Sequence, residues 1–280
     1  MNNGFWRRFR RNRAALAGAA ILILIEICAL AAPWLAGHDP WAMVQQPFLV
    51  PGQQPGFPMG SDALGRDVAS GLLFGARVSM LIGLLATAVA LLLGIGLGAI
   101  AGYHGGWVDA LLMRFTELFQ AIPGFAFAVV LVAIFQPSVQ SIVAAIAIVS
   151  WPPVARLVRG EFLTLRGREF VAAAQLAGQS SMRIIFTQIL PNAVSPIVVM
   201  GSLMIASSIL LESALSFLGL GDPNVISWGY MVGAARTALR EAWWVAMFPG
   251  LAIMLTVLSL NLVGEGLADG LNARLDGRTR

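Results

Sequence analysis

The chain of 280 residues contains no lysine, so all eighteen of its basic residues are arginine. A phosphate-binding loop of the GxxxxGK[ST] type and a Schiff-base mechanism both need a lysine, so both are excluded. The single cysteine, Cys28, cannot form a disulfide within the chain. The two histidines, His38 and His104, fall in different expected loops, which gives a histidine-based metal cluster nothing to build on. We therefore expect no enzyme, no metal site and no cofactor bound by this chain, and any ATP that drives it must bind another subunit.

Charge is scarce as well, since only 11% of the residues are charged while 58% are hydrophobic, and the mean hydropathy is +0.79. This composition is typical of an integral membrane protein. A helix needs about 20 apolar residues to cross a bilayer, and six segments are long enough. They cover residues 14–35, 78–102, 111–135, 139–158, 189–211 and 245–267. The sequence thus predicts an all-α protein with six transmembrane helices.

The arginines are distributed unevenly between the two sides of the predicted helices, which fixes the expected orientation. With the N-terminus inside, the cytoplasm receives Arg7, Arg8, Arg10, Arg11, Arg13, Arg114, Arg156, Arg159, Arg166, Arg168, Arg183, Arg274, Arg278 and Arg280. The outside keeps Arg66, Arg77, Arg236 and Arg240. Both termini are therefore expected in the cytoplasm. The basic pI of about 10.5 reflects this topogenic arginine beside anionic lipid, and we expect no nucleic-acid partner.

Two segments are expected outside the membrane on the far side. Residues 36–77 begin with a proline-rich part that cannot form regular structure, and the apolar spacing from Asp62 onward predicts a short interfacial helix before the second span. Residues 212–244 form the other segment. Its tryptophans, Trp228, Trp243 and Trp244, are expected in the interfacial aromatic belt rather than in a binding cage.

Small residues and prolines mark special positions inside the spans. Gly94, Gly98 and Gly102 are four residues apart and do not fit a nucleotide-binding glycine loop, so we expect them at a close helix–helix contact. Pro123 and Gly124 interrupt the third span, which is tolerated only where protein or a water-filled path covers the freed backbone groups. Residues 152–153, both proline, are expected to bend the fourth span.

Glu26 is the one carboxylate well inside a predicted span. An acidic residue at this depth either lines a pathway and pairs with another group, or sits protonated or hydrogen-bonded at a helix contact. Both interpretations stay open because the sequence identifies no partner. Glu212, at the end of the fifth span, is a second candidate for pairing or for the pathway, together with the break at Pro123 and Gly124.

Residues 167–192, "GREFVAAAQLAGQSSMRIIFTQILPN", are unusually mixed for so apolar a chain. A helical interpretation of 168–176 places Ala172, Ala173 and Ala174 on a slim helix able to enter a groove of another protein. Gly178 ends this helix at a position where a positive φ is commonly needed. A second, amphipathic helix is expected from about Ser180 and returns to the membrane just before Pro191. A lipid environment does not require two such helices joined by a glycine turn, so we interpret this stretch as a docking surface for a cytoplasmic partner.

This stretch resembles the EAA loop of ABC-transporter permeases, whose pattern is EAA, three residues, G, nine residues and I-x-LP. Here the pattern is matched by Ala172, Ala173, Ala174, Gly178, Ile189 (one residue late), Leu190 and Pro191. Three further stretches resemble the C-type permeases of dipeptide, oligopeptide and nickel importers, over residues 14–271 in all: "GSDALGRDVASGLLFGARVSMLIGL", "AGYHGGWVDALLMR" and "ESALSFLGLGDP".

The chain departs from the family pattern in one respect, because Ala172 replaces the glutamate that names the motif. The contact made by that carboxylate cannot be transferred to this position. Glu169 lies three residues earlier, on roughly the same helical face. We hypothesise that it takes over part of the role.

The resemblance implies a type I ABC importer permease fold with a cytoplasmic coupling helix. Residues 1–76 would form the N-terminal arm, the first transmembrane helix and an extracytoplasmic segment. Residues 77–268 would form the permease domain with its coupling loop at 159–188, and residues 269–280 the cytoplasmic tail. The implied setting is the lipid bilayer of a bacterial inner membrane.

The implied partners are a second, homologous permease, two cytoplasmic ATPases that bind the ATP and Mg, and an extracytoplasmic substrate-binding protein. Di- or oligopeptides are the default substrate, while nickel chelates and glutathione-like compounds remain alternatives. The competing function is an ion-coupled secondary transporter acting without ATPases, which would use Glu26. An ABC exporter fits the EAA-like pattern less well.

Overall fold

The computed structural model describes residue 6 and residues 8–276. Arg7, Arg278 and Arg280, which belong to the predicted arm and tail, lie outside the described residues. Within the described part the regular structure is helical, apart from two isolated β-bridges that pair Met43 with Arg66 and Ser61 with Asp67. The all-α prediction is therefore confirmed.

Among residues 6 and 8–276, five stretches of helix are long and apolar enough to cross a membrane. They are α2 (Arg13–Leu30), α4 (Val68–His104), α7 (Val139–Arg166), α12 (Trp243–Asp276) and the continuous stretch Ser181–Leu220. That stretch contains α9 (Ser181–Ile184), the π-helical turn η1 (Ile185–Ile189), α10 (Leu190–Leu215) and a second π-helical turn, η2 (Ser216–Leu220). Three short helices lie outside these: α3 (Ala32–Leu35), α8 (Glu169–Leu176) and α11 (Trp228–Ala235).

The predicted third span, 111–135, is not one straight helix but the pair α5 (Gly106–Ala121) and α6 (Gly124–Phe135), bent by 82°. A proline disfavours helical backbone at the residue before it, and Ile122 accordingly adopts an extended conformation with φ −91° and ψ 131°. The described part of the chain has six candidate spans if this bent pair counts as one. By contrast, the prolines at 152–153 lie inside α7 without ending it.

The prediction of a separate short helix from Asp62 is wrong. Helix begins at Val68 and continues without a break for 37 residues through the second span. Asp67 starts it, because its carboxylate accepts hydrogen bonds from the backbone N–H groups of Ala69 and Ser70 at 3.2 and 3.0 Å. Asp62 instead accepts from the backbone N–H of Arg66 and holds a turn.

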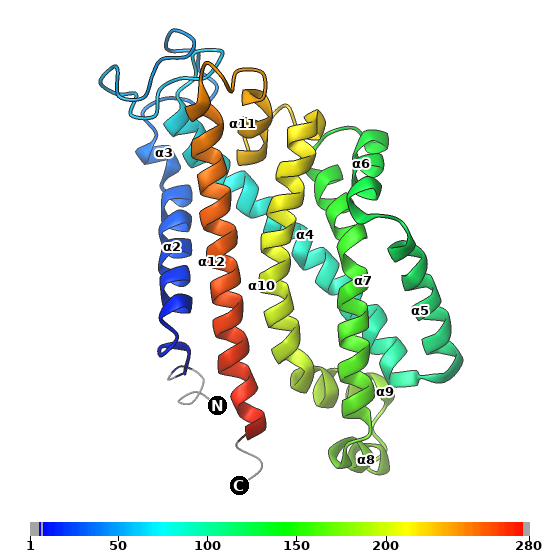
Figure 1. Cartoon of the computed structure of the whole chain (residues 1–280). Coiled ribbons are helices and arrows are strands. Elements are labelled where there is room, and N and C mark those ends of the chain that lie inside the picture. The colour runs from blue at the N-terminus through cyan, green and yellow to red at the C-terminus, as the bar shows by residue number, and fades with distance from the viewer. Residues whose placement is uncertain (1–5, 7, 277–280) are drawn as a thin grey trace.

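Figure 1 shows α2 and α12 side by side at one edge of the bundle and α5 and α6 at the opposite edge, with α4 crossing between them obliquely. One end of the bundle carries α8 and α9, and there α2 begins and α12 ends (Figure 1); we call it the α8 end. The opposite end carries α11 and the irregular segment 36–67; we call it the α11 end. The fold thus places segment 36–67 and α11, which belong to the two segments predicted on the far side, at one end, and the predicted docking stretch with α8 at the other.

Candidate functional site

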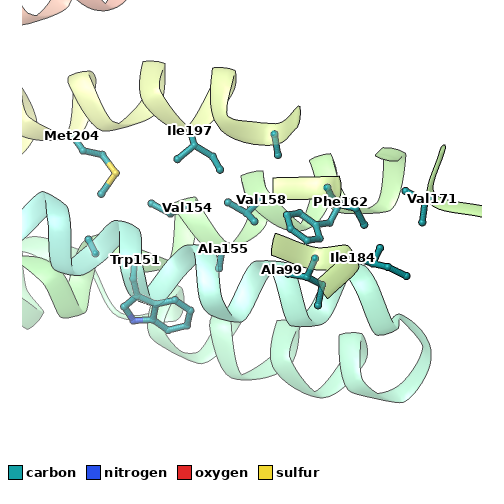
Figure 2. Packing of buried hydrophobic residues seen from close by; sticks show 14 of the residues in the cluster. Ala99, Trp151, Val154, Ala155, Val158, Phe162, Val171, Ile184, Ile197 and Met204 are labelled. Carbon is teal, nitrogen blue, oxygen red and sulfur yellow. The ribbon is translucent and has the colours of Figure 1, made fainter. Parts of the chain in front are cut away.

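Helix α8 is a separate eight-residue helix between α7 and α9, held to the bundle along one side. A helix this short is not stable alone in water, so packing must hold it in place. Val171 is fully buried and Ala174 is 7% exposed, in one cluster with Phe162 of α7 and Ile184 of α9. Figure 2 shows Val171 and Ile184 beside Phe162. Burying a valine is worth about 1.5–3 kcal/mol, so α8 is fastened to the end of α7.

The opposite side of α8 is uncovered within this chain. Leu176 is 91% exposed and Phe170 38% exposed, and Glu169, Ala172 and Ala173 are exposed as well. The run of three alanines is therefore split, because Ala174 packs on its own chain and is not available to a partner. The available face is apolar with one carboxylate at its first turn.

Gly178 has φ 72° and ends α8 in a Schellman motif. Its N–H donates to the carbonyl of Gln175 at 2.9 Å, and the N–H of Gln179 donates to the carbonyl of Ala174 at 3.1 Å. A side chain at this φ is strained, which explains the glycine.

After Ser180 the chain becomes helical again and runs through η1 into α10. Pro191 stands in the first turn of α10, directly after Leu190. A proline ring clashes with the carbonyl four residues earlier in an α-helix, and the wider π-helical turn of η1 lies at that point. Leu190 packs partly buried against the cluster that also receives Val171.

An ion pair that the sequence did not reveal joins α5 to α7 at the α8 end. Nη2 of Arg159 donates to Oδ2 of Asp109 at 2.6 Å, and Nε of Arg159 donates to Oδ1, so the pair is bidentate. Two turns further on, Nη1 of Arg166 donates to the carbonyls of Gly102 and Tyr103 at 3.3 and 3.1 Å. The last two turns of α7, which lead directly into α8, therefore contact the start of α5 through Arg159 and the end of α4 through Arg166.

The three glycines of α4 lie where this helix passes α7. A Cβ at Gly94 would be 2.9 Å from the carbonyl oxygen of Trp151, and one at Gly102 would be 2.8 Å from that of Arg159. Gly98 faces the carbonyl oxygen of Ala155 still more closely. Figure 2 shows Ile197 and Met204 of α10 on the side that faces α7, so α7 is packed between two helices.

Glu212 lies within a helix, because α10 continues to Leu215, four residues past the predicted end of the fifth span. Its side chain is 1% exposed and accepts hydrogen bonds from the hydroxyls of Ser216 at 2.8 Å and Ser227 at 2.7 Å. Ser227 in turn accepts from the backbone N–H of Tyr230 and starts α11. The carboxylate therefore ties α10 to the first turn of α11.

The remaining predicted site residues are not brought together. Glu26 lies half-buried in α2, and no hydrogen bond or ion pair joins its side chain to another described residue. Pro123 and Gly124 are exposed at the bend between α5 and α6, at the opposite edge of the bundle. Among the described residues there is also no group of three or more His, Cys, Asp or Glu residues suited to a metal ion.

Related sequences cover nearly the whole chain. The di/tripeptide transport system permease protein DppC of Pseudomonas aeruginosa (strain UCBPP-PA14) is 43% identical over 277 residues, which is 97% of this chain and 91% of the relative. The glutathione transport system permease protein GsiD of Pectobacterium atrosepticum is 40% identical over 272 residues, which is 97% of this chain and 90% of the relative.

Among solved structures, an inward-facing form of the MetNI methionine ABC transporter matches with a TM-score of 0.58. The match covers 75% of this chain and 97% of that chain, at 14% identity, so the likeness is one of fold. The predicted type I importer permease fold is thereby confirmed.

Two family models match different parts of the sequence. The N-terminal TM domain of oligopeptide transport permease C matches residues 3–54. The binding-protein-dependent transport system inner membrane component matches residues 94–277. The chain is therefore a multi-pass membrane protein that belongs to the family of binding-protein-dependent transport system inner membrane components.

Proposed function

We propose that this chain is one of two permease subunits of an ATP-driven importer for di- or oligopeptides. The observation that carries the proposal is α8, a helix fastened to α7 on one side and uncovered on the other. Such a helix can contact a separate ATPase on its uncovered side and transmit the movement of that subunit to the helix bundle. The peptide substrate is supported by the names of the relatives, which include a di/tripeptide permease.

The α8 end faces the cytoplasm in this proposal, and the α11 end faces the extracytoplasmic side. Fourteen of the eighteen arginines are then inside, as the positive-inside rule requires. Both chain ends lie in the cytoplasm with α8, and an extracytoplasmic binding protein delivers substrate to the α11 end. A second permease and two ATPases complete the importer.

Coupling follows from the contacts at the end of α7. When the ATPases close on ATP, α8 moves with α7, because Val171 and Phe162 share one buried cluster. Arg159 and Arg166 then carry the movement to α5 and α4 through the contacts with Asp109 and with the carbonyls of Gly102 and Tyr103. Packed helices switch between discrete arrangements, so the bundle rocks and access to the path between the two permeases alternates.

Glu169 supplies the test of coupling, because it is the one carboxylate on the uncovered face of α8. The full importer with Glu169→Ala, reconstituted in vesicles, should assemble and hydrolyse ATP but import fewer labelled dipeptides per ATP. Glu241→Ala is the matched control, since Glu241 is an exposed acid in the connection between α11 and α12. If both variants import the same number of dipeptides per ATP, Glu169 has no specific role in coupling.

The competing function, an ion-coupled secondary transporter, is separated by a simpler experiment. Vesicles containing this chain alone should take up no dipeptide under a proton or sodium gradient. Uptake that needs no ATPase and is lost in Glu26→Gln would replace the importer proposal. Labelled glutathione and a nickel chelate, offered to the full importer beside dipeptides, decide the substrate class.

A further inference from the structure

A small pocket opens at the α11 end between segment 36–67 and α11. Its volume is about 180 Å³. Its lining is mainly apolar and includes Phe48, Val68, Ile226, Met231, Ala235 and Val245. An apolar cavity of about 150 Å³ is large enough for benzene, so this pocket has room for one aromatic or branched side chain. Sites for whole small-molecule ligands are larger, at about 300–1,000 Å³.

The irregular wall of the pocket is held in place by specific hydrogen bonds. The hydroxyl of Ser61 donates to the carbonyl of Gln46 at 2.7 Å and accepts from the N–H of Leu49 at 2.9 Å. The indole N–H of Trp244 donates to the carbonyl of Ser61 at 3.3 Å. The segment is thus tied to α12, and the pocket does not have to be formed when something binds.

Arg66 lines the pocket, and no acid among the described residues forms an ion pair with it. Its guanidinium carbon lies 4.7 Å from the ring centroid of Trp41, and the Trp41 ring in turn contacts Tyr230, another lining residue. Within residues 6 and 8–276, the Nε of Arg66 is buried without a hydrogen-bond partner, and its guanidinium forms no ion pair. Leaving a buried donor unsatisfied costs about 1–3 kcal/mol, and more for a charged group.

The two acids that also line the pocket form hydrogen bonds within their own turns and no ion pair with Arg66. Asp62 accepts from the backbone N–H groups of Leu64 and Arg66 at 2.8 and 2.9 Å. Asp67 accepts from the N–H and the hydroxyl of Ser70 at the start of α4. Both carboxylates therefore bond to groups in their own turns and neither pairs with the Arg66 guanidinium, so a carboxylate from outside the chain can do so.

We propose that this pocket receives one apolar side chain of the extracytoplasmic binding protein, with a carboxylate of that protein pairing with Arg66. The inference rests on the proposed function, which places a binding protein at the α11 end. The volume suits a single side chain rather than a whole peptide, and the unpaired guanidinium selects an acidic neighbour. A buried anchor beside a charged pair is a common arrangement at protein–protein contacts.

The test uses the complete importer in lipid nanodiscs and the purified, dipeptide-loaded binding protein as the probe, with binding measured by surface plasmon resonance. Arg66→Gln should weaken binding about 10-fold and reduce its dependence on salt. Ala234→Trp places a ring at the exposed rim of the pocket and should weaken binding to a similar degree. Arg240→Gln removes the same charge from an exposed position in the connection between α11 and α12 and should change binding less than 2-fold.

Two results would overturn the proposal. If Arg66→Gln and Ala234→Trp both bind like Arg240→Gln, the pocket is not a contact site. If labelled dipeptide binds the importer without the binding protein and loses that binding in Arg66→Gln, the occupant is the substrate instead. Failure of the proposed function is distinguishable, because wild-type importer would then show no ATP-dependent dipeptide uptake at all.

Discussion

Helices α4 and α7 approach each other closely at Gly98, where even one methyl group should be costly. A Cβ at this position would collide with the carbonyl oxygen of Ala155 and lie 2.9 Å from the Cβ of Val158. The carbonyl belongs to the helix backbone and cannot rotate away, so α4 and α7 must move apart. Overpacking of this kind costs about 1–3 kcal/mol. We therefore expect Gly98→Ala to lower the free energy of unfolding by that amount.

Gly96 gives a matched control in the same helix, because a Cβ there meets no atom within 4 Å. Alanine is favoured over glycine inside a helix by up to about 1 kcal/mol, so Gly96→Ala should leave stability unchanged or raise it. Both variants are compared with wild type by thermal unfolding in one detergent, followed by size-exclusion chromatography of the remaining folded protein. If Gly98→Ala unfolds at the same temperature as Gly96→Ala, the close contact of α4 with α7 is not real.

Three further substitutions test the other contacts. Asp109→Asn should lower stability in the same assay by roughly 1–3 kcal/mol, which lies between the values for exposed and for buried ion pairs. Exchanging the charges of Asp109 and Arg159 should restore part of the lost stability. If the exchange restores none of it, the ion pair itself contributes little. Glu212→Leu leaves two serine hydroxyls without their acceptor and should lower stability by about 1–3 kcal/mol for each hydroxyl. Glu212→Gln keeps an acceptor and should lower stability less. Equal losses of stability in the two variants would refute this explanation. Gly178→Ala forces a side chain to φ 72° at a cost of about 1–2 kcal/mol. The variant should import fewer dipeptides per ATP than wild type, and this loss should be larger than its lower unfolding temperature accounts for. A loss of import that the lower unfolding temperature explains in full would show that α8 is not a separate lever.

The features that depend on neighbouring residues could be predicted from the sequence. The helix break at residues 122–124 follows from one proline, and the turn after α8 follows from one glycine with a positive φ. The spacing of Gly94, Gly98 and Gly102 indicates one helix face whatever the partner helix is. These properties depend on a few neighbouring residues each, so they can be predicted from a single sequence.

Other features were missed although the sequence contains a signal for them. Asp67 followed by Ser70 is a typical helix start, and its recognition would have corrected the helix expected from Asp62. Glu212 and Ser216 are one helical turn apart, which would have indicated that the helix continues past the apolar run. Ala172, Ala173 and Ala174 look alike in sequence, and only the packing of α8 on α7 shows that Ala174 faces inward.

Long-range pairs could not be predicted at all. Asp109 and Arg159 are 50 positions apart, and the pocket at Arg66 forms from α11 and α12 as well as from its own segment. Which of many possible partners a side chain meets is decided by how α4, α5 and α7 cross. The way in which these helices cross cannot be predicted from a single sequence.

The central claim, that α8 is the contact for a separate ATPase, is tested most directly by cross-linking from a single cysteine. With Cys28→Ser as background, Leu176→Cys places the thiol at a position that is 91% exposed on α8. Thr237→Cys places it at an exposed position in the connection between α11 and α12. In the assembled importer, a short bifunctional reagent should join the ATPase to residue 176 and not to residue 237. No cross-link from 176, or an equal one from 237, would contradict the account.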